Sequence, residues 1–140
     1  SYSKSYFYED VRGDIEELIM FDCQYFYEFS INVIYFFLKT LNIEKICFVD
    51  KDLDKKFGEA NNRLVNLCNE VNASKYLSGI GAKSYIDEDI FLKNGIDIIY
   101  QDYFPRPYKQ LSNKFIPGLS IIDALFNCGY CETEKLIKYQ

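Results

Sequence analysis

Residues 75–100, which read KYLSGIGAKSYIDEDIFLKNGIDIIY, decide the fold. An apolar run at 75–78 and a β-branched run at 96–100 are each typical of a short strand. Between them, residues 87–93 have helical periodicity, and Asn94-Gly95 is a typical helix terminator. A strand, a helix and a strand in this order predict parallel strands joined by a right-handed crossover.

The same pattern extends upstream. The apolar run 45–49 predicts a further strand, and helical spacing over 59–71 predicts a further crossover helix. We therefore expect an α/β fold with a small parallel sheet, whose strands lie near 45–49, 75–78 and 96–100. Such a sheet with crossover helices corresponds to a Rossmann-like half.

Both ends of the chain are expected to be helical. Residues 9–20 and 23–41 predict two N-terminal helices, and the second is apolar on most sides, so we expect it to be central and buried. Near the other end, helices are predicted over 119–126 and 132–139. Gly129 falls between these two helices and is interpreted as the terminator of the first.

Size and charge limit the possible classes of protein. The 140 residues suit a single domain. The net charge of −5 argues against a nucleic-acid partner, because nucleic-acid binding calls for a clustered basic surface. No apolar run approaches the ~20 residues of a membrane-spanning helix, so no membrane span is expected.

Histidine is absent, which excludes a Ser-His-Asp triad, a Cys-His dyad and a His-based zinc site within this sequence. The cysteines are odd in number, and Cys23, Cys47 and Cys68 lie in apolar patterns typical of small buried residues. This usage, together with the lack of a visible signal peptide, favours a cytoplasmic protein. No metal site is predicted, and the cofactor is left open.

The first candidate site follows the strand at 75–78. Ligands of open parallel sheets bind beyond the carboxyl ends of the strands, and Ser78 lies at such an end. Glycines there let backbone N–H groups approach a phosphate or carboxylate, and Asp87 is placed to accept a proton. The alternative is a turn in which the glycines need positive φ. The expected substrate-binding residues of this segment are Gly79, Gly81, Lys83 and Tyr85.

Polar residues also follow the strand at 96–100. Gln101 and Tyr103 come directly after it, and Tyr108 and Gln110 lie in a proline-marked loop. Amides and phenols at the carboxyl end of a strand are typical of a substrate-binding wall. The alternative is a proline-stiffened loop whose tyrosines pack on the core.

A third candidate lies in the predicted helix 119–126. Ser120 and Asp123 have the spacing of an N-terminal capping box, which is the favoured interpretation. In the functional alternative, Asp123 and Asn127 lie one helical turn apart and face the same ligand.

Cys128 and Cys131 have the spacing of a redox motif. In a thioredoxin-like site the pair follows a strand and opens a helix, whereas here it follows a predicted helix. No second cysteine pair completes a zinc site. A redox or metal role is therefore disfavoured, and the role of the two thiols is left open.

Taken together, these stretches resemble the WbqC-like family, whose members occur among bacterial genes for O-antigen and capsular polysaccharide. The resemblance covers most of the chain, and its ordered series of short matches is more specific than any one of them. The matching motifs are Tyr76-Leu77-Ser78-Gly79-x-Gly81, Tyr85-x-Asp87, Gln101-x-Tyr103, Tyr108-x-Gln110 and the run from Phe115 to Gly129.

The resemblance implies a polysaccharide-biosynthesis protein that transfers glycine or another aminoacyl group to a sugar or nucleotide-sugar acceptor. It also implies that residues 1–140, a single α/β domain, form the C-terminal part of a longer protein, because family members usually begin with a strand carrying a His-Gln-Pro motif. A second departure is Pro105-Arg106-Pro107, where the family usually has His-Pro. The alternative function is a non-catalytic binding or assembly module.

The expected ligand is therefore a small molecule or a sugar nucleotide. Ser78 and the loop amides would hold its anionic group, and Asp87 or Asp123 would orient or deprotonate an acceptor hydroxyl or amine. Ser78, Asp87 and Asp123 are thus the expected catalytic residues. Assembly into a homo-oligomer is a further expectation.

Overall fold

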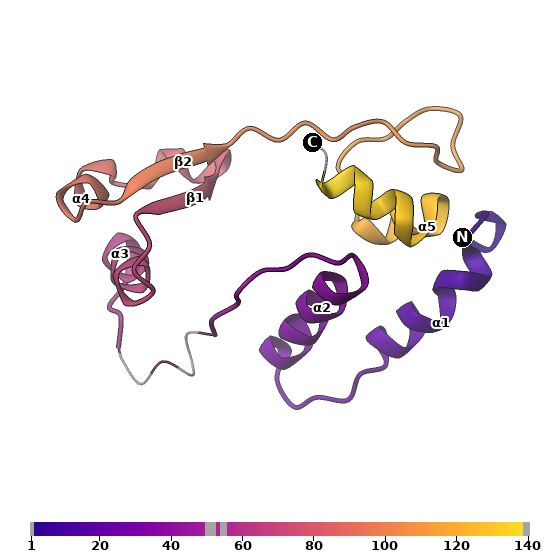
Figure 1. Cartoon of the computed structure of the whole chain (residues 1–140), viewed down its shortest axis with the longest axis horizontal. Coiled ribbons are helices and arrows are strands. Elements are labelled where there is room, and N and C mark those ends of the chain that lie inside the picture. Colours follow the sequence, from indigo (N-terminus) through magenta and orange to yellow (C-terminus); the bar gives the residue numbers. More distant parts are fainter. Residues whose placement is uncertain (1, 50–52, 54–55, 139–140) are drawn as a thin grey trace. The chain divides into compact units, whose positions relative to one another are not determined.

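The computed structural model of the chain describes residues 2–49, 53 and 56–138 (Figure 1). The chain divides into two compact units, which are described separately. Unit 1 comprises Ser1–Ile46 and Pro105–Gln140, and unit 2 comprises Cys47–Phe104. The expectation that residues 1–140 form a single domain stays a prediction.

Unit 1 is helical. Its described elements are a short 3-10 helix, η1 (Tyr2–Lys4), and the α-helices α1 (Tyr8–Ile19), α2 (Phe26–Thr40) and α5 (Ile121–Lys138). Helix α1 packs against η1, α2 and α5. Its apolar residues recur every three or four positions, so Val11, Ile15 and Leu18 are buried on one face.

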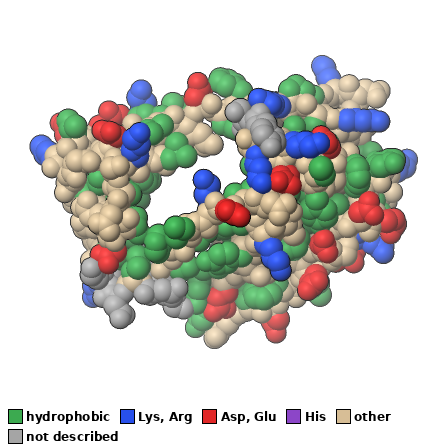
Figure 2. Space-filling view, viewed as in Figure 1, with side chains coloured by type: hydrophobic (Ala, Val, Ile, Leu, Met, Phe, Trp, Pro, Cys, Tyr) green, Lys and Arg blue, Asp and Glu red, His purple; other side chains and the backbone are tan. Residues whose placement is uncertain are grey.

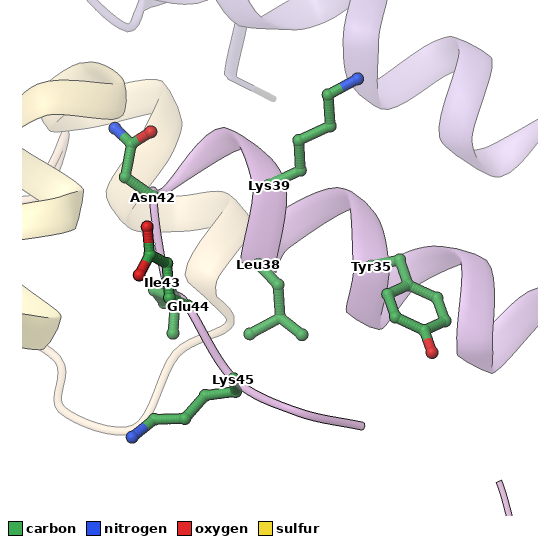
Figure 3. Close-up of a pocket in the computed structure, with 7 residues that line it drawn as sticks. All are labelled: Tyr35, Leu38, Lys39, Asn42, Ile43, Glu44 and Lys45. Carbon is green, nitrogen blue, oxygen red and sulfur yellow. The ribbon is translucent and has the colours of Figure 1, made fainter. Parts of the chain in front are cut away.

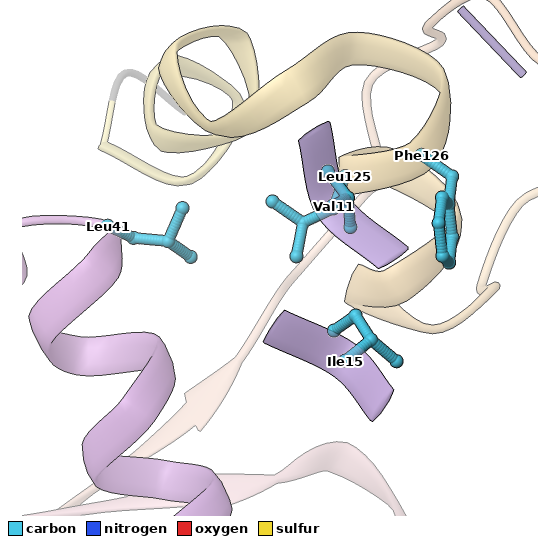
Figure 4. Close-up of a cluster of buried hydrophobic side chains, with 5 residues drawn as sticks. All are labelled: Val11, Ile15, Leu41, Leu125 and Phe126. Carbon is cyan, nitrogen blue, oxygen red and sulfur yellow. The ribbon is translucent and has the colours of Figure 1, made fainter. Parts of the chain in front are cut away.

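The core of unit 1 lies where these helices meet (Figure 4). The buried cluster consists of Val11, Ile15, Leu41, Leu125 and Phe126. The ring of Tyr2 stacks on the ring of Phe126, with centroids 4.8 Å apart. The Phe7 N–H donates to the Phe126 carbonyl at 3.2 Å. These contacts fix the N-terminal segment against α5.

Helix α5 is kinked at Gly129. This residue has φ 75° and ψ 177°, a conformation that is essentially restricted to glycine. A Cβ here would lie 2.8 Å from Cδ1 of Phe7, so the kink also makes room for that ring. The predicted interruption is confirmed, because α5 consists of two helical segments that meet at the non-helical Gly129. The predicted end at Tyr139 lies outside the described residues.

The interpretation of α2 as a buried central helix is wrong. None of its described residues is buried, and Phe26 is 82% exposed. The helix joins the core through its C-terminal end, where Phe37 packs on the cluster and Leu41 is buried. Hydrophobic side chains therefore lie among charged ones on the surface (Figure 2).

Unit 2 contains the described sheet. Its elements are α3 (Ala60–Glu70), β1 (Lys75–Gly79), the 3-10 helix η3 (Ile80–Ser84), α4 (Glu88–Lys93) and β2 (Asp97–Gln101). Strands β1 and β2 are parallel, with Ser78 paired to Tyr100 and Gly79 paired to Gln101. The strand–helix–strand prediction for residues 75–100 is confirmed (Figure 1).

The helices of unit 2 cover a small core. Helix α4 packs on β2, and α3 packs on α4. The buried cluster consists of Val65, Cys68, Phe91 and Ile96. Gly95 has φ 70°, and the Ile96 N–H donates to the Phe91 carbonyl at 3.0 Å, which confirms the predicted end of α4.

The predicted strand at 45–49 is wrong. Within the described part of the chain the sheet has two strands, and residues 43–49 have no regular secondary structure. Ile46 is 85% exposed and Phe48 is 62% exposed, so neither side chain packs on a neighbouring strand. Cys47 is also exposed, unlike the buried Cys68. The α/β class therefore holds, while the Rossmann-like detail stays a prediction.

Candidate functional site

The predicted site residues fall into two groups, one in each unit. Unit 2 contains Ser78, Gly79, Gly81, Lys83, Tyr85, Asp87, Gln101 and Tyr103, whereas unit 1 contains Tyr108, Gln110, Asp123 and Asn127. Each group is described by itself.

The loop after β1 in unit 2 has ordinary backbone geometry. Ser78 is buried, and its hydroxyl donates to the Gly79 carbonyl at 3.3 Å. Gly79 has φ −67°, and Gly81 is not among the described glycines with positive φ. A Cβ at either glycine would meet no atom of the described residues within 4 Å. The interpretation as a turn that needs positive φ is therefore wrong, and the backbone here is open to approach.

Lys83 of η3 lies over an aromatic ring. Its Nζ is 5.3 Å from the centroid of Tyr100, a cation–π geometry. The Tyr100 hydroxyl donates to Glu88 Oε1 at 2.8 Å. Desolvation and this bond to Glu88 raise the pKa of Tyr100. The remaining predicted residues here, Tyr85, Gln101 and Tyr103, are exposed.

Asp87 is the N-cap of α4. Its carboxylate accepts a hydrogen bond from the Asp89 N–H at 3.1 Å. The Asp87 N–H donates to Asn61 Oδ1, and Asn61 Nδ2 donates to the Tyr85 carbonyl, both at 3.3 Å. Asn61 thereby joins α3 to the start of α4. Capping accounts for the carboxylate, and the expected catalytic role of Asp87 stays a prediction.

In unit 1, Asp123 is the centre of a hydrogen-bonded group that we name the Asp123 cluster: Tyr2, Tyr108, Gln110, Asp123 and Asn127. Asp123 is buried, with only 5% of its surface exposed. Its Oδ2 accepts hydrogen bonds from the Tyr108 hydroxyl at 2.8 Å and from Gln110 Nε2 at 3.2 Å. Burial, followed by the neighbouring Asp123, raises the pKa of the Tyr2 phenol. A buried carboxylate is therefore held by neutral donors.

The capping-box prediction is correct for one of its two residues. Ser120 Oγ accepts a hydrogen bond from the Ile122 N–H at 3.3 Å, as an N-cap does. The bonds described for the Asp123 carboxylate go to the 108–110 segment instead. Asp123 thus joins a loop to α5.

Gln110 fixes the loop through both ends of its amide. Its Nε2 donates to the Ile116 carbonyl at 3.0 Å as well as to Asp123, and its Oε1 accepts from the Ile116 N–H at 2.8 Å. Asn127 Nδ2 donates to the backbone carbonyl of Asp123 at 2.8 Å. Among the described residues, Oδ1 of Asn127 has no assigned donor, so it is available to a ligand.

The cluster shifts the titration of its neighbours. Burial raises the pKa of Tyr108 to about 12, and the bond to Asp123 acts in the same direction. Tyr108 is therefore a hydrogen-bond donor at neutral pH. Burial, followed by the charge of Asp123, raises the pKa of the Cys128 thiol. A raised thiol pKa disfavours redox chemistry, and no group of potential ligands among the described residues could hold a metal ion.

A pocket of about 450 Å³ lies beside this cluster in unit 1. Gln110 and Asn127 belong to both, since they line the pocket and bond to Asp123. The full lining is Lys4, Tyr6, Phe7, Lys109, Gln110, Leu111 and Asn127. Sequence reasoning missed Lys4, Tyr6 and Lys109 as site residues. Lys109 stands between two predicted ones, whereas no local signal marks the other two.

A second pocket, of about 300 Å³, lies at the end of α2 (Figure 3). Its lining consists of Tyr35, Leu38, Lys39, Asn42, Ile43, Glu44 and Lys45. Figure 3 shows Tyr35 and Leu38 projecting from one side of α2 and Lys39 from the other. None of its residues is a predicted site residue, so the candidate site is the pocket beside Asp123.

No described helix is long and apolar enough to cross a membrane.

Comparison with known proteins identifies the family of the chain. Over 78 residues the chain is 44% identical to an uncharacterized protein of Mycobacterium tuberculosis (strain ATCC 25618 / H37Rv), Rv1507c, and this match covers 55% of the chain and 33% of that relative. The chain thus spans about one third of the relative it matches, and no solved structure matches it. The model of the WbqC-like protein family matches residues 1–135, and the chain therefore belongs to that family.

Proposed function

We propose that the chain is part of a transferase of polysaccharide biosynthesis, which moves glycine or another aminoacyl group onto a sugar or nucleotide-sugar acceptor. Membership of the WbqC-like family supports this setting. The observation that carries the proposal is the Asp123 cluster, where Tyr108 and Gln110 of one motif meet Asp123 and Asn127 of another beside a pocket.

The chemistry is acyl transfer. The hydroxyl or amine of the acceptor attacks the carbonyl carbon of an activated aminoacyl donor, an ester or amide bond forms, and the bond to the donor's leaving group breaks. The acceptor's proton passes to a base or to that leaving group. Because Asp123 reaches the pocket through Gln110 and Asn127, its proposed role is to position these amides for the acceptor.

The loop after β1 is the second proposed part of the site. Ser78 and the exposed backbone of Gly79 and Gly81 are proposed to hold an anionic group of the ligand, and Asp87 is the alternative base. The open space around both glycines supports this role, because no described neighbour explains why they are glycines.

The test is transfer by the chain and its variants, with activated aminoacyl adenylates and thioesters as donors and sugar nucleotides as acceptors, followed by mass spectrometry of the acceptor. Asp123→Asn is expected to lower kcat about 100-fold with a smaller change in KM, because misplaced groups cost rate. Exposed Asp22→Asn is the matched control. Unchanged activity in both Asp123→Asn and Ser78→Ala, with the fold intact, contradicts the placement.

The exposed face of α2 favours a second function, a non-catalytic binding or assembly module. Phe26, Ile34 and Tyr35 of this helix and its N-cap residue Tyr25 are large and exposed. Exposed apolar side chains gathered on one helix are suited to an interface, here with another copy of the chain. Sedimentation should then show a dimer that Phe26→Ser and Ile34→Ser convert to a monomer. A wild-type monomer at micromolar concentration contradicts this second function.

A further inference from the structure

The pocket beside the Asp123 cluster carries a concentrated positive charge. Of its seven lining residues, Lys4 and Lys109 are basic and none is acidic, although the chain as a whole has a net charge of −5. Within the described part of the chain, neither ammonium forms an ion pair. Two like charges facing one small space repel each other unless an anion lies between them.

The nearest buried carboxylate does not neutralise these lysines. The Oδ2 of Asp123 is already bonded to Tyr108 and Gln110, and Asp123 is not among the residues that line the pocket. Asn127 adds Oδ1 at the pocket wall, which can accept a hydrogen bond from a sugar hydroxyl. The polar side of the pocket therefore combines two cations with one acceptor.

The other side of the pocket is aromatic and apolar. Tyr6 is 88% exposed, and its ring meets the ring of Phe7 edge to face at 4.9 Å. Leu111 is also exposed at this wall. An exposed phenol that shares a pocket with two lysines is suited to stack on a planar ring, because every heterocyclic base has a π-face.

We propose that this pocket binds a nucleoside diphosphate group, with the two phosphates held by Lys4 and Lys109 and the base stacked on Tyr6. The volume of about 450 Å³ lies within the range of small-molecule sites. The inference deepens the proposed function, on which it rests for its biological setting, by assigning the nucleotide part of the acceptor to unit 1 instead of to the loop after β1.

The experiment is isothermal titration calorimetry of the whole chain with uridine diphosphate, adenosine diphosphate, the two nucleosides and inorganic pyrophosphate. A diphosphate is expected to bind, with each of Lys4→Gln and Lys109→Gln weakening affinity about tenfold, since hydrogen bonds to charged groups contribute this much. Tyr6→Ala should weaken nucleoside diphosphate binding and leave pyrophosphate binding unchanged. Both lysines and Tyr6 are exposed, so these variants should keep the wild-type circular dichroism spectrum.

The matched control is Lys93→Gln, which removes an exposed lysine outside both proposed sites. Lys83→Gln removes the lysine of the loop after β1 and compares that loop with the pocket. Loss of binding in Lys83→Gln but not in the Lys4 and Lys109 variants overturns the inference, as does the absence of binding by every diphosphate. Because binding is measured without an acyl donor, the two proposals fail separately. Diphosphate binding without transfer contradicts the proposed function alone, whereas transfer that is insensitive to both lysine substitutions contradicts this inference alone.

Discussion

Asp123 in unit 1 and Asp87 in unit 2 are carboxylates in similar sequence settings, each near the start of a helix, yet the structure uses them differently. Asp87 is exposed and bonds to the N–H of Asp89, two residues away. Asp123 is buried and bonds to side chains 13 and 15 residues earlier in the chain. A carboxylate that bonds to a neighbouring N–H caps a helix, as Asp87 does. A carboxylate that bonds to distant side chains, as Asp123 does, forms a polar centre beside a pocket.

Gly129 of unit 1 and the two glycines of the loop after β1 differ in the same way. Gly129 has a positive φ and faces the ring of Phe7, so both its conformation and its surroundings require glycine. Gly79 and Gly81 meet neither requirement among the described residues. Tight packing therefore requires a glycine at position 129 of unit 1, whereas the described structure shows no such requirement at Gly79 and Gly81.

The largest expected effect is that of Gly129→Ala. Backbone strain and the clash with Phe7 should together lower the free energy of unfolding by about 4 kcal/mol. Gly79→Ala should change it by less than about 1 kcal/mol. Urea unfolding followed by circular dichroism measures both. Equal effects of the two substitutions would show that the contrast between the glycines is not real.

Next in size is the removal of the buried carboxylate. Asp123→Ala leaves the Tyr108 hydroxyl and a Gln110 N–H without their acceptor, which should cost about 3 kcal/mol. Asp87→Ala removes an N-cap and should cost about 1 kcal/mol. Urea midpoints of the two variants compare them directly. A larger loss for Asp87→Ala would reverse the assigned roles of polar centre and cap.

A smaller effect concerns alkaline pH. The folded pKa of Tyr108 is raised from 10.0 to about 12, mainly by burial, so the protonated phenol contributes stability below pH 10. That contribution is lost as the pH rises from 10 to about 12, because the unfolded chain ionises first. Subtracting the ultraviolet titration of Tyr108→Phe from that of the wild type should give a midpoint near 12. A midpoint near 10 would mean that Tyr108 is not buried beside Asp123 in solution.

The smallest effect is expected at Ser78. Its hydroxyl bonds to the adjacent Gly79 carbonyl at 3.3 Å, so Ser78→Ala should cost about 0.5 kcal/mol. If urea unfolding instead shows a loss close to that of Asp123→Ala, the loop after β1 is as tightly specified as the Asp123 cluster.

Local patterns were sufficient for part of the fold. The strands at 75–78 and 96–100 and the terminator Gly95 follow from residues that are neighbours in sequence, and the structure has all three. The run at 45–49 has the same apolar character but finds no partner strand in the described structure. Strand propensity without a cross-strand neighbour is not enough to form a strand.

The site depended on contacts that local patterns do not record. Helical spacing predicts that Asp123 and Asn127 lie together, and the structure has their bond. Nothing local indicated that Tyr108 and Gln110 would meet Asp123, because those bonds cross a loop with no regular structure. Helix α2 illustrates the converse. Its composition predicts burial, yet burial requires a partner, and the described chain leaves its face exposed.

The side chain of Gln110 takes the part of a peptide group, since it gives an N–H to the Ile116 carbonyl and receives the Ile116 N–H, as one strand does with another. Residues 111–115 are therefore closed off at their base by the Gln110 amide, which also donates to Asp123, and the described bonds of the Asp123 carboxylate go to none of these five residues. Closing a loop of greater length costs little free energy. Relatives can thus lengthen or recompose this loop, and so reshape the pocket wall at Leu111, while the carboxylate beneath it keeps its place. The ligand can therefore differ between relatives while the polar centre around Asp123 stays the same.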